Sequence, residues 1–122
     1  MRRDLELLRE ILLSVEVAEG PFDLTDARLS GHSFAELAHH AELLIEAGLI
    51  KGEVVYSDSV GTPVWVRILR LTWSGHEFLA TARDERTWQQ ALQACPQGPA
   101  AVSFEVLCDV LAEATRARFR PM

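Results

Sequence analysis

The stretch SFAELAHHAELLIEAGLI, which runs from Ser33 to Ile50, has the pattern of a helix that turns directly into a β-strand. Ser33 and Glu36 form a capping box, in which two side chains satisfy backbone N–H groups at the helix start. Gly48 stands where the end of a helix needs a left-handed backbone conformation. Apolar residues at helical spacing give the helix one face that packs on the core, namely Phe34, Leu37, Ala38, Ala41, Leu44, Ile45 and Gly48.

The opposite face of this helix is a candidate interaction face, made of Glu36, His39, His40, Leu43 and Glu46. The stretch contains three glutamates, and it has no arginine or lysine before Lys51. Contacts to DNA bases and phosphates depend mostly on Arg, Lys, Asn and Gln side chains. We therefore interpret this face as a site for a protein, and a role in reading a DNA groove is disfavoured.

The residues before Ser33 predict one helix and one irregular segment. Asp4 favours the start of a helix that runs to Ala18, because Gly20 and Pro21 stop it. Apolar residues recur along this helix at helical spacing, namely Leu5, Leu7, Leu8, Ile11, Leu12 and Val15. Residues 22–31 have no helical period, and we expect a short strand or an irregular crossing there.

The residues after Gly48 predict a β-hairpin and three helices. Residues 49–56 and 64–71 are rich in β-branched and aromatic side chains and are separated by SDSVGTP, as in a hairpin with a loose loop. Capping residues precede three further helices: Thr72 before residues 73–82, Asp84 before a helix through residue 94, and Ser103 before a helix through residue 117. The order of helix, short strand, helix and hairpin is that of a winged helix, so the predicted class is α+β.

The composition indicates one ordinary domain. The chain has 122 residues, 48% of them hydrophobic, which is enough for one core but not two. We expect a single domain over residues 1–122, with its core in residues 4–95 and a C-terminal helix at 103–117. No apolar run has the length of a membrane span, and the start resembles neither a signal nor a transit peptide. The expected location is the cytoplasm, where Cys95 and Cys108 would be free thiols.

Charge is unevenly distributed along the chain. The net charge is −6, and the first 60 residues hold five basic against twelve acidic residues, so this half would repel phosphate. Two groups of arginines stay open as contacts for nucleic acid or an acidic partner: Arg67 and Arg70, and Arg116, Arg118 and Arg120. Alternatively, the first pair neutralises Glu53 or another acid on the neighbouring strand, and the second group complements a helix dipole.

No pattern in the sequence predicts an enzyme, a metal site or a cofactor. The chain has no Gly-rich phosphate loop and no nucleophile elbow. His39 and His40 are adjacent, and side chains of adjacent helical residues point about 100° apart, so the two do not converge on one ion. Four large side chains at helical spacing are predicted to be core, namely Trp73, Phe78, Leu79 and Trp88.

The last helix carries more apolar surface than one packing contact needs. One stripe consists of Phe104, Leu107, Leu111 and Ala114, and a second stripe contains Val106 and Val110. A surface helix buries only one stripe, so the second indicates a further contact, either with the helix that starts at Asp84 or with another chain. We predict Val106 and Val110 as contacts of a homodimer.

Four segments of the chain resemble the domain of unknown function 2513 family, small proteins of bacteria and their phages. They are MRRDLELLREILLSVE at the start, HAELLIEAGLI (40–50), RLTWSGHEFLATARDERTW (70–88) and SFEVL (103–107). The resemblance implies a winged-helix-like fold and no established activity. Residues 22–32 depart from an ordinary winged helix, because they show little sign of the positioning helix that a DNA-binding helix-turn-helix requires.

Together these features predict a non-catalytic, winged-helix-like module that binds a protein, as a homodimer, in a regulatory or phage-related role. One alternative is a transcriptional regulator that presents its arginines to DNA. Another is an acidic inhibitor that occupies the basic groove of a host nucleic-acid-binding protein. The charge on the Ser33 helix disfavours the regulator, and the arginine cluster near the carboxyl end keeps it open.

Overall fold

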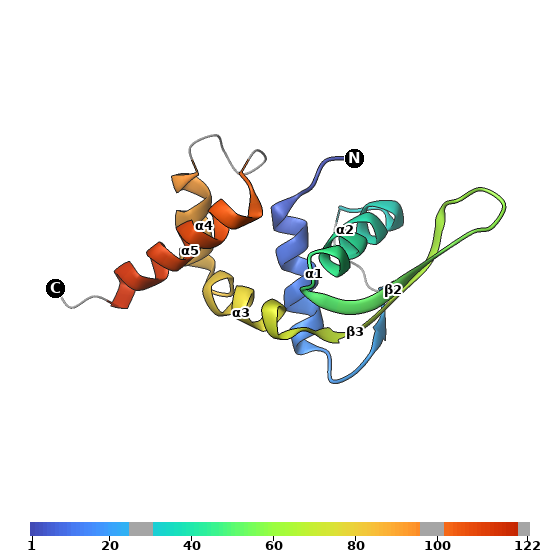
Figure 1. The fold of residues 1–122 in the computed structure, drawn as a ribbon, viewed down its shortest axis with the longest axis horizontal. Helices are drawn as coiled ribbons and strands as arrows, with labels where there is room; N and C mark the ends of the chain where they lie inside the picture. Colours follow the sequence, from blue (N-terminus) through green and yellow to red (C-terminus); the bar gives the residue numbers. More distant parts are fainter. Residues whose placement is uncertain (25–30, 96–101, 120–122) are drawn as a thin grey trace. The chain divides into compact units, whose positions relative to one another are not determined.

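The computed structural model describes residues 1–24, 31–95 and 102–119, and it shows the predicted α+β class (Figure 1). In chain order the elements are α1 (Leu5–Val17), β1 (Phe22–Asp23), α2 (Phe34–Glu46), β2 (Ile50–Tyr56), β3 (Pro63–Leu71), α3 (Trp73–Ala82), α4 (Glu85–Ala94) and α5 (Phe104–Phe119). The chain groups into two compact units, Met1–His76 and Glu77–Met122. No helix in the described part of the chain is long and apolar enough to cross a membrane.

Helix starts in both units follow the capping chemistry of the sequence. Five side-chain oxygens accept hydrogen bonds from first-turn N–H groups: Asp4 from Glu6 and Leu7, Ser33 from Glu36, Thr72 from Gly75, Asp84 from Thr87, and Ser103 from Val106. Each bond satisfies a backbone donor that has no partner within its helix. All five predicted caps are confirmed, and the predicted helix limits differ from the observed ones by at most two residues.

The sheet of the first unit is antiparallel, with the strand order β1-β3-β2. On β3, Val66 and Ile68 are fully buried, whereas Arg67 between them points to the exposed face. Gly52 of β2 lies against β3 so closely that a Cβ atom there would be 2.5 Å from the Arg67 carbonyl oxygen. The β2–β3 connection projects beyond α2 (Figure 1).

The predicted inward face of α2 packs on the core of the first unit. Leu37, Ala38, Ala41 and Leu44 are buried, and Phe34 and Ile45 are half-buried. Gly48 has a φ of 76°, the left-handed conformation that ends α2 and directs the chain into β2. The predicted apolar face of α1 is buried as well, from Leu5 to Val15.

The start of α3 is held against the end of α2 by two close contacts. The Thr72 hydroxyl donates a hydrogen bond to the Gly48 carbonyl oxygen. A Cβ atom at Gly75 would lie 2.1 Å from the Leu49 carbonyl oxygen, so only glycine fits there. These residues of the RLTWSGHEFL segment therefore have a structural role.

The second unit is built around Trp88, which is fully buried on α4. The ring of Phe78 packs on Trp88 edge to face, with ring centroids 6.4 Å apart, and on Phe104 at 5.1 Å. Leu107 and Leu111 of α5 are fully buried, and α5 packs against α4.

Trp73 does not belong to the core, and the prediction that it does is wrong. Its side chain is 78% exposed. The buried residues of α3 are Gly75, Phe78, Leu79 and Ala82, which follow one another at helical spacing. Trp73 lies two residues before Gly75, the first residue of that stripe, and residues two apart on a helix point to different sides.

Candidate interaction surface

The outer side of α2 carries a stripe of one histidine, one leucine and two glutamates. His39, Glu42 and Leu43 are half-buried, and Glu46 is exposed. The spacing of three and four residues places these side chains next to one another on the helix surface. We call these four residues, together with Tyr56 of β2, the acidic stripe.

Tyr56 joins β2 to this stripe. Its hydroxyl donates a hydrogen bond to the Glu42 carboxylate. That bond, followed by burial and by the negative charges of Glu42 and Glu46, raises the pKa of Tyr56 above its ordinary value. The two carboxylates and the phenol therefore share one local environment of negative potential.

The negative charge of the acidic stripe is not compensated within α2. The helix has Glu36 in its first turn, no basic residue in its last turn, and Glu46 as its last residue. The carboxyl end of a helix carries a partial negative charge, so an acid there is unfavourable by about 0.3–1 kcal/mol. A glutamate at position 46 therefore lowers the stability of α2.

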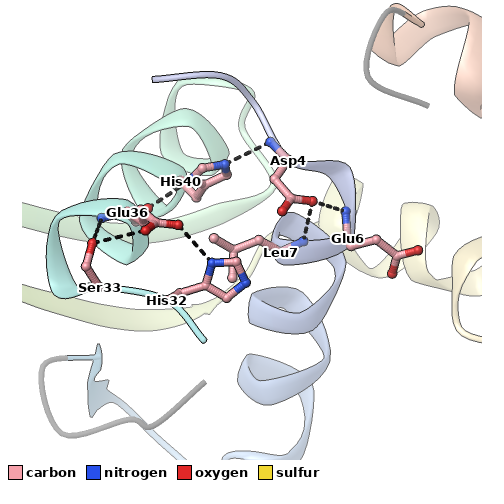
Figure 2. Close-up of polar contacts among 7 residues, drawn as sticks. All are labelled: Asp4, Glu6, Leu7, His32, Ser33, Glu36 and His40. Carbon is pink, nitrogen blue, oxygen red and sulfur yellow. Dashed lines mark hydrogen bonds and ion pairs between the residues drawn. The ribbon is translucent and has the colours of Figure 1, made fainter. Parts of the chain in front are cut away.

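His40 is buried, and its predicted place on the outward face is wrong. Its side chain is 2% exposed. The His40 Nε2 atom accepts a hydrogen bond from the Asp4 backbone N–H at 2.9 Å, and Nδ1 donates one to the Glu36 carbonyl oxygen at 2.8 Å (Figure 2). Helical spacing alone places His40 on the outer face, because it takes no account of other segments of the chain that pack on α2. The segment at the start of α1 binds His40 and covers it.

Glu36 takes part in the helix cap at the amino end of α2. Its carboxylate contacts the His32 Nδ1 atom at 2.9 Å and the Ser33 hydroxyl at 3.3 Å (Figure 2). The hydrogen bond with His32 is the largest cause that lowers the pKa of Glu36, and the Ser33 backbone N–H adds to it. Because this carboxylate is bonded within the cap, we leave Glu36 out of the acidic stripe.

The two strand arginines differ in their surroundings. Arg67 lies opposite Glu53 on β2 and opposite Asp23 on β1, so the sheet register places this arginine across from the predicted acid, Glu53. Arg70 is exposed, and its guanidinium donates a hydrogen bond to the Leu71 carbonyl oxygen at 2.9 Å. The sheet register therefore gives Arg67, but not Arg70, acidic neighbours.

The terminal arginines lie near acids of their own unit. Arg118 contacts Asp84 at 2.6 Å and the Thr87 hydroxyl at 2.9 Å, and Arg116 contacts Glu113 at 3.4 Å. The Thr87 backbone N–H is the largest cause that lowers the pKa of Asp84, and the charge of Arg118 lowers it further. Arg120 lies outside the described residues.

The second apolar stripe of α5 is partly exposed. Val106 is 43% exposed, and Val110 is half-buried. Cys108, between them, is half-buried and has a free thiol, whose pKa is raised first by burial and then by the charge of Asp109. Cys95 is buried and also free.

Within residues 1–24, 31–95 and 102–119, no three or more His, Cys, Asp or Glu side chains group together to hold a metal ion. Two members of the acidic stripe, Glu42 and Tyr56, were not predicted as site residues. Glu42 could have been found, because it lies three residues after His39 and four before Glu46. Tyr56 could not, since its contact with Glu42 depends on how β2 packs against α2.

Comparison with known proteins places the chain in a family. Residues 2–101 match the family described as hypothetical protein (DUF2513), so the match ends before α5. An uncharacterized protein of Haemophilus influenzae is 34% identical over 89 residues, which cover 72% of this chain and 73% of that protein. No solved structure matches the chain. The chain therefore belongs to the domain of unknown function 2513 family.

Proposed function

We propose that this protein is a non-catalytic, winged-helix-like module that binds another protein with a basic surface through its acidic stripe. The observation that carries the proposal is the uncompensated charge of Glu42 and Glu46 in the last turns of α2. A cation on a partner would relieve the repulsion that Tyr56 and the helix end impose on these carboxylates. The half-buried Leu43 beside them supplies apolar contact area.

Two features support the winged-helix assignment. The element order and the sheet order β1-β3-β2 agree with such a fold, and α2 leads through Gly48 into the β2–β3 hairpin. In DNA-binding members of this architecture, the helix in the position of α2 enters the major groove. Residues 25–30, where a positioning helix could lie, are outside the described part of the chain.

Protein is a better partner for α2 than DNA. No residue of α2 is Arg, Lys, Asn or Gln, and the hairpin residues 57–62 contain Asp58 and no cation. Duplex DNA is expected to bind no more tightly than in a generic non-specific interaction and to dissociate as salt is raised. A sequence-selective complex that is lost in His39→Ala would contradict this proposal.

Capture of the partner from the native cell tests the proposal directly. We expect a protein with a basic surface to bind the unmodified chain and to be lost when Glu42 and Glu46 are both changed to Gln. The matched control changes Glu10 and Glu77, two exposed acids on α1 and α3, to Gln and removes the same charge elsewhere. Equal losses in both double variants, or capture that persists without Glu42 and Glu46, would contradict the role of the stripe.

The same experiment distinguishes an inhibitor from other binding modules. If the captured partner binds nucleic acid, the acidic stripe would occupy the groove that the nucleic acid uses. The unmodified protein should then displace nucleic acid from the partner, and the Glu42/Glu46 variant should not.

A homodimer through α5 is the second candidate interaction, and the exposure of Val106 favours it. Pairing of α5 with its copy would bury Val106 and Val110 and bring Arg116 and Arg118 of two chains near each other. Salt would then strengthen the pairing, because it screens the repulsion between these arginines. Val106→Glu together with Val110→Glu should give a folded monomer. Sedimentation of the unmodified protein as a monomer at high micromolar concentration would contradict the dimer.

A further inference from the structure

The first unit has a hollow away from the acidic stripe. It encloses about 210 Å³ between the end of α1, the end of β3 and the first turn of α3. Its lining residues are Val15, Glu16, Ala18, Glu19, Gly20, Leu69, Arg70, Leu71 and His76. Pockets for drug-sized ligands have volumes of about 300–1,000 Å³, so this hollow fits a smaller group, on the scale of one amino-acid residue.

One wall of the hollow presents hydrogen-bond donors. The Arg70 guanidinium is oriented by its bond to the Leu71 carbonyl oxygen, and within the described residues it makes no ion pair. The His76 imidazole likewise has no hydrogen-bond partner in the part of the chain that the structure describes. An arginine fork and an imidazole at one surface are suited to bind a carboxylate.

The side of the hollow that the end of α1 forms is acidic. Glu16 and Glu19 line it, and α1 ends there without a basic residue in its last turn. Free carbonyl groups at a helix end and nearby carboxylates accept hydrogen bonds from an amide or ammonium group. A doubly charged phosphate would be repelled by this wall more strongly than a singly charged carboxylate.

Trp73 is an exposed aromatic residue one helical turn before His76, which lines the hollow. It precedes His76 by three residues on α3, so the two side chains are neighbours on the helix surface. An indole that is 78% exposed contributes little to the core, but it can cover an apolar side chain of a ligand. Arg70, Trp73 and His76 are thus exposed residues of the same segment in which Thr72 and Gly75 have structural roles.

We propose that this hollow binds the α-carboxylate of an amino acid or of a polypeptide chain end. Arg70 and His76 hold the carboxylate, the Glu19 wall receives the adjacent N–H or ammonium group, and Trp73 covers the side chain. The inference is independent of the acidic stripe, which lies on α2 and β2.

Nuclear magnetic resonance of the full chain tests this proposal with two tetrapeptides. Acetyl-tetraalanine with a free carboxylate should shift the Trp73 indole N–H signal, which Trp73→Phe identifies, and the same peptide with a terminal amide should not. Arg70→Gln should weaken the binding by about tenfold or more, because a charge-assisted pair is lost. Arg67→Gln is the matched control on the same strand and should leave the binding unchanged.

Free alanine distinguishes the two sources of the carboxylate. If alanine binds at least as tightly as the carboxylate peptide, and its binding depends on Arg70, the site is assigned to free amino acids. If alanine binds more weakly than the peptide, the site is assigned to chain ends. Equal shifts with the carboxylate and amide peptides, no shift with any of the three probes, or equal effects of Arg67→Gln and Arg70→Gln would overturn the proposal.

Discussion

Helices α2 and α5 are both amphipathic, but the charged residues in their last turns have opposite effects on helix stability. The last turn of α5 carries Arg116 and Arg118, which complement the negative end of the helix dipole and contact acids of the same unit. The last turn of α2 has no basic residue and ends in Glu46. The arginines of α5 are thus accounted for by folding, whereas Glu46 at the end of α2 is unfavourable for it.

This difference separates charges that stabilise the fold from charges that are available to a partner. Proteins break local stability rules mostly at sites under another constraint, and we propose that the acidic stripe is such a site. By the same reasoning, Arg116 and Arg118 are weaker candidates for nucleic-acid contacts than their clustering in the sequence indicates.

The largest expected effect is at Leu44, on the inner side of α2. Its side chain is 1% exposed, so Leu44→Ala leaves a cavity and should lower the free energy of unfolding by about 2–5 kcal/mol. Leu43→Ala, on the half-buried outer side, is the matched control and should have a much smaller effect. Equal losses at both positions in denaturant titrations would show that the outer side also belongs to the core.

The next effect concerns the polar contact between α1 and α2. His40→Ala removes the acceptor of the Asp4 backbone N–H and the donor to the Glu36 carbonyl oxygen, and it should cost about 1–3 kcal/mol. His39→Ala, one position along the same helix, should cost far less. Chemical denaturation of the two variants measures the difference, and similar midpoints would mean that the contact contributes little.

A smaller, pH-dependent effect is expected at Asp84, the acid that contacts α5. Its pKa is lowered from its ordinary value of 3.8, first by the Thr87 N–H group and also by Arg118. Because the pKa of Asp84 is lower in the folded than in the unfolded protein, the ionised carboxylate stabilises the fold at pH values above the unfolded-state pKa. This stability is lost as the pH falls through the folded-state pKa.

Asp84→Asn should therefore be less stable than the unmodified protein at neutral pH, and the difference should shrink below pH 3.8. Thermal unfolding at a series of pH values measures this change. Asp58→Asn in the hairpin loop is the control and should show no comparable trend. A difference that stays constant down to pH 2 would contradict a contribution from the ionised carboxylate.

Local chemistry explains why so much of the fold could be predicted from the sequence. Capping residues, the Gly48 turn and strand composition act over a few neighbouring residues, so their patterns are visible in one segment. The partly exposed stripe at Val106 and the position of Arg67 opposite Glu53 likewise follow from helical and strand periodicity.

The remaining features depend on segments that are far apart in the sequence. His40 is buried because the start of α1, 36 residues earlier, reaches it. Tyr56 completes the acidic stripe because the end of β2 contacts α2, and the hollow beside Arg70 needs three elements to meet. The exposure of Trp73, in contrast, could have been predicted from local spacing, because Trp73 is outside the apolar stripe of α3. Its aromatic character alone does not indicate that it is buried.

The smallest expected change tests the central claim, that Glu46 is kept for a partner rather than for the fold. Glu46→Gln removes a charge from the negative end of α2 and should raise the free energy of unfolding by about 0.3–1 kcal/mol. Glu36→Gln, at the positive end of the same helix, should lower it, because the carboxylate there is bonded to His32. Denaturant titrations of both variants decide between the accounts. A Glu46→Gln variant that is less stable than the unmodified protein would show that this acid serves the fold, and the claim would then be contradicted.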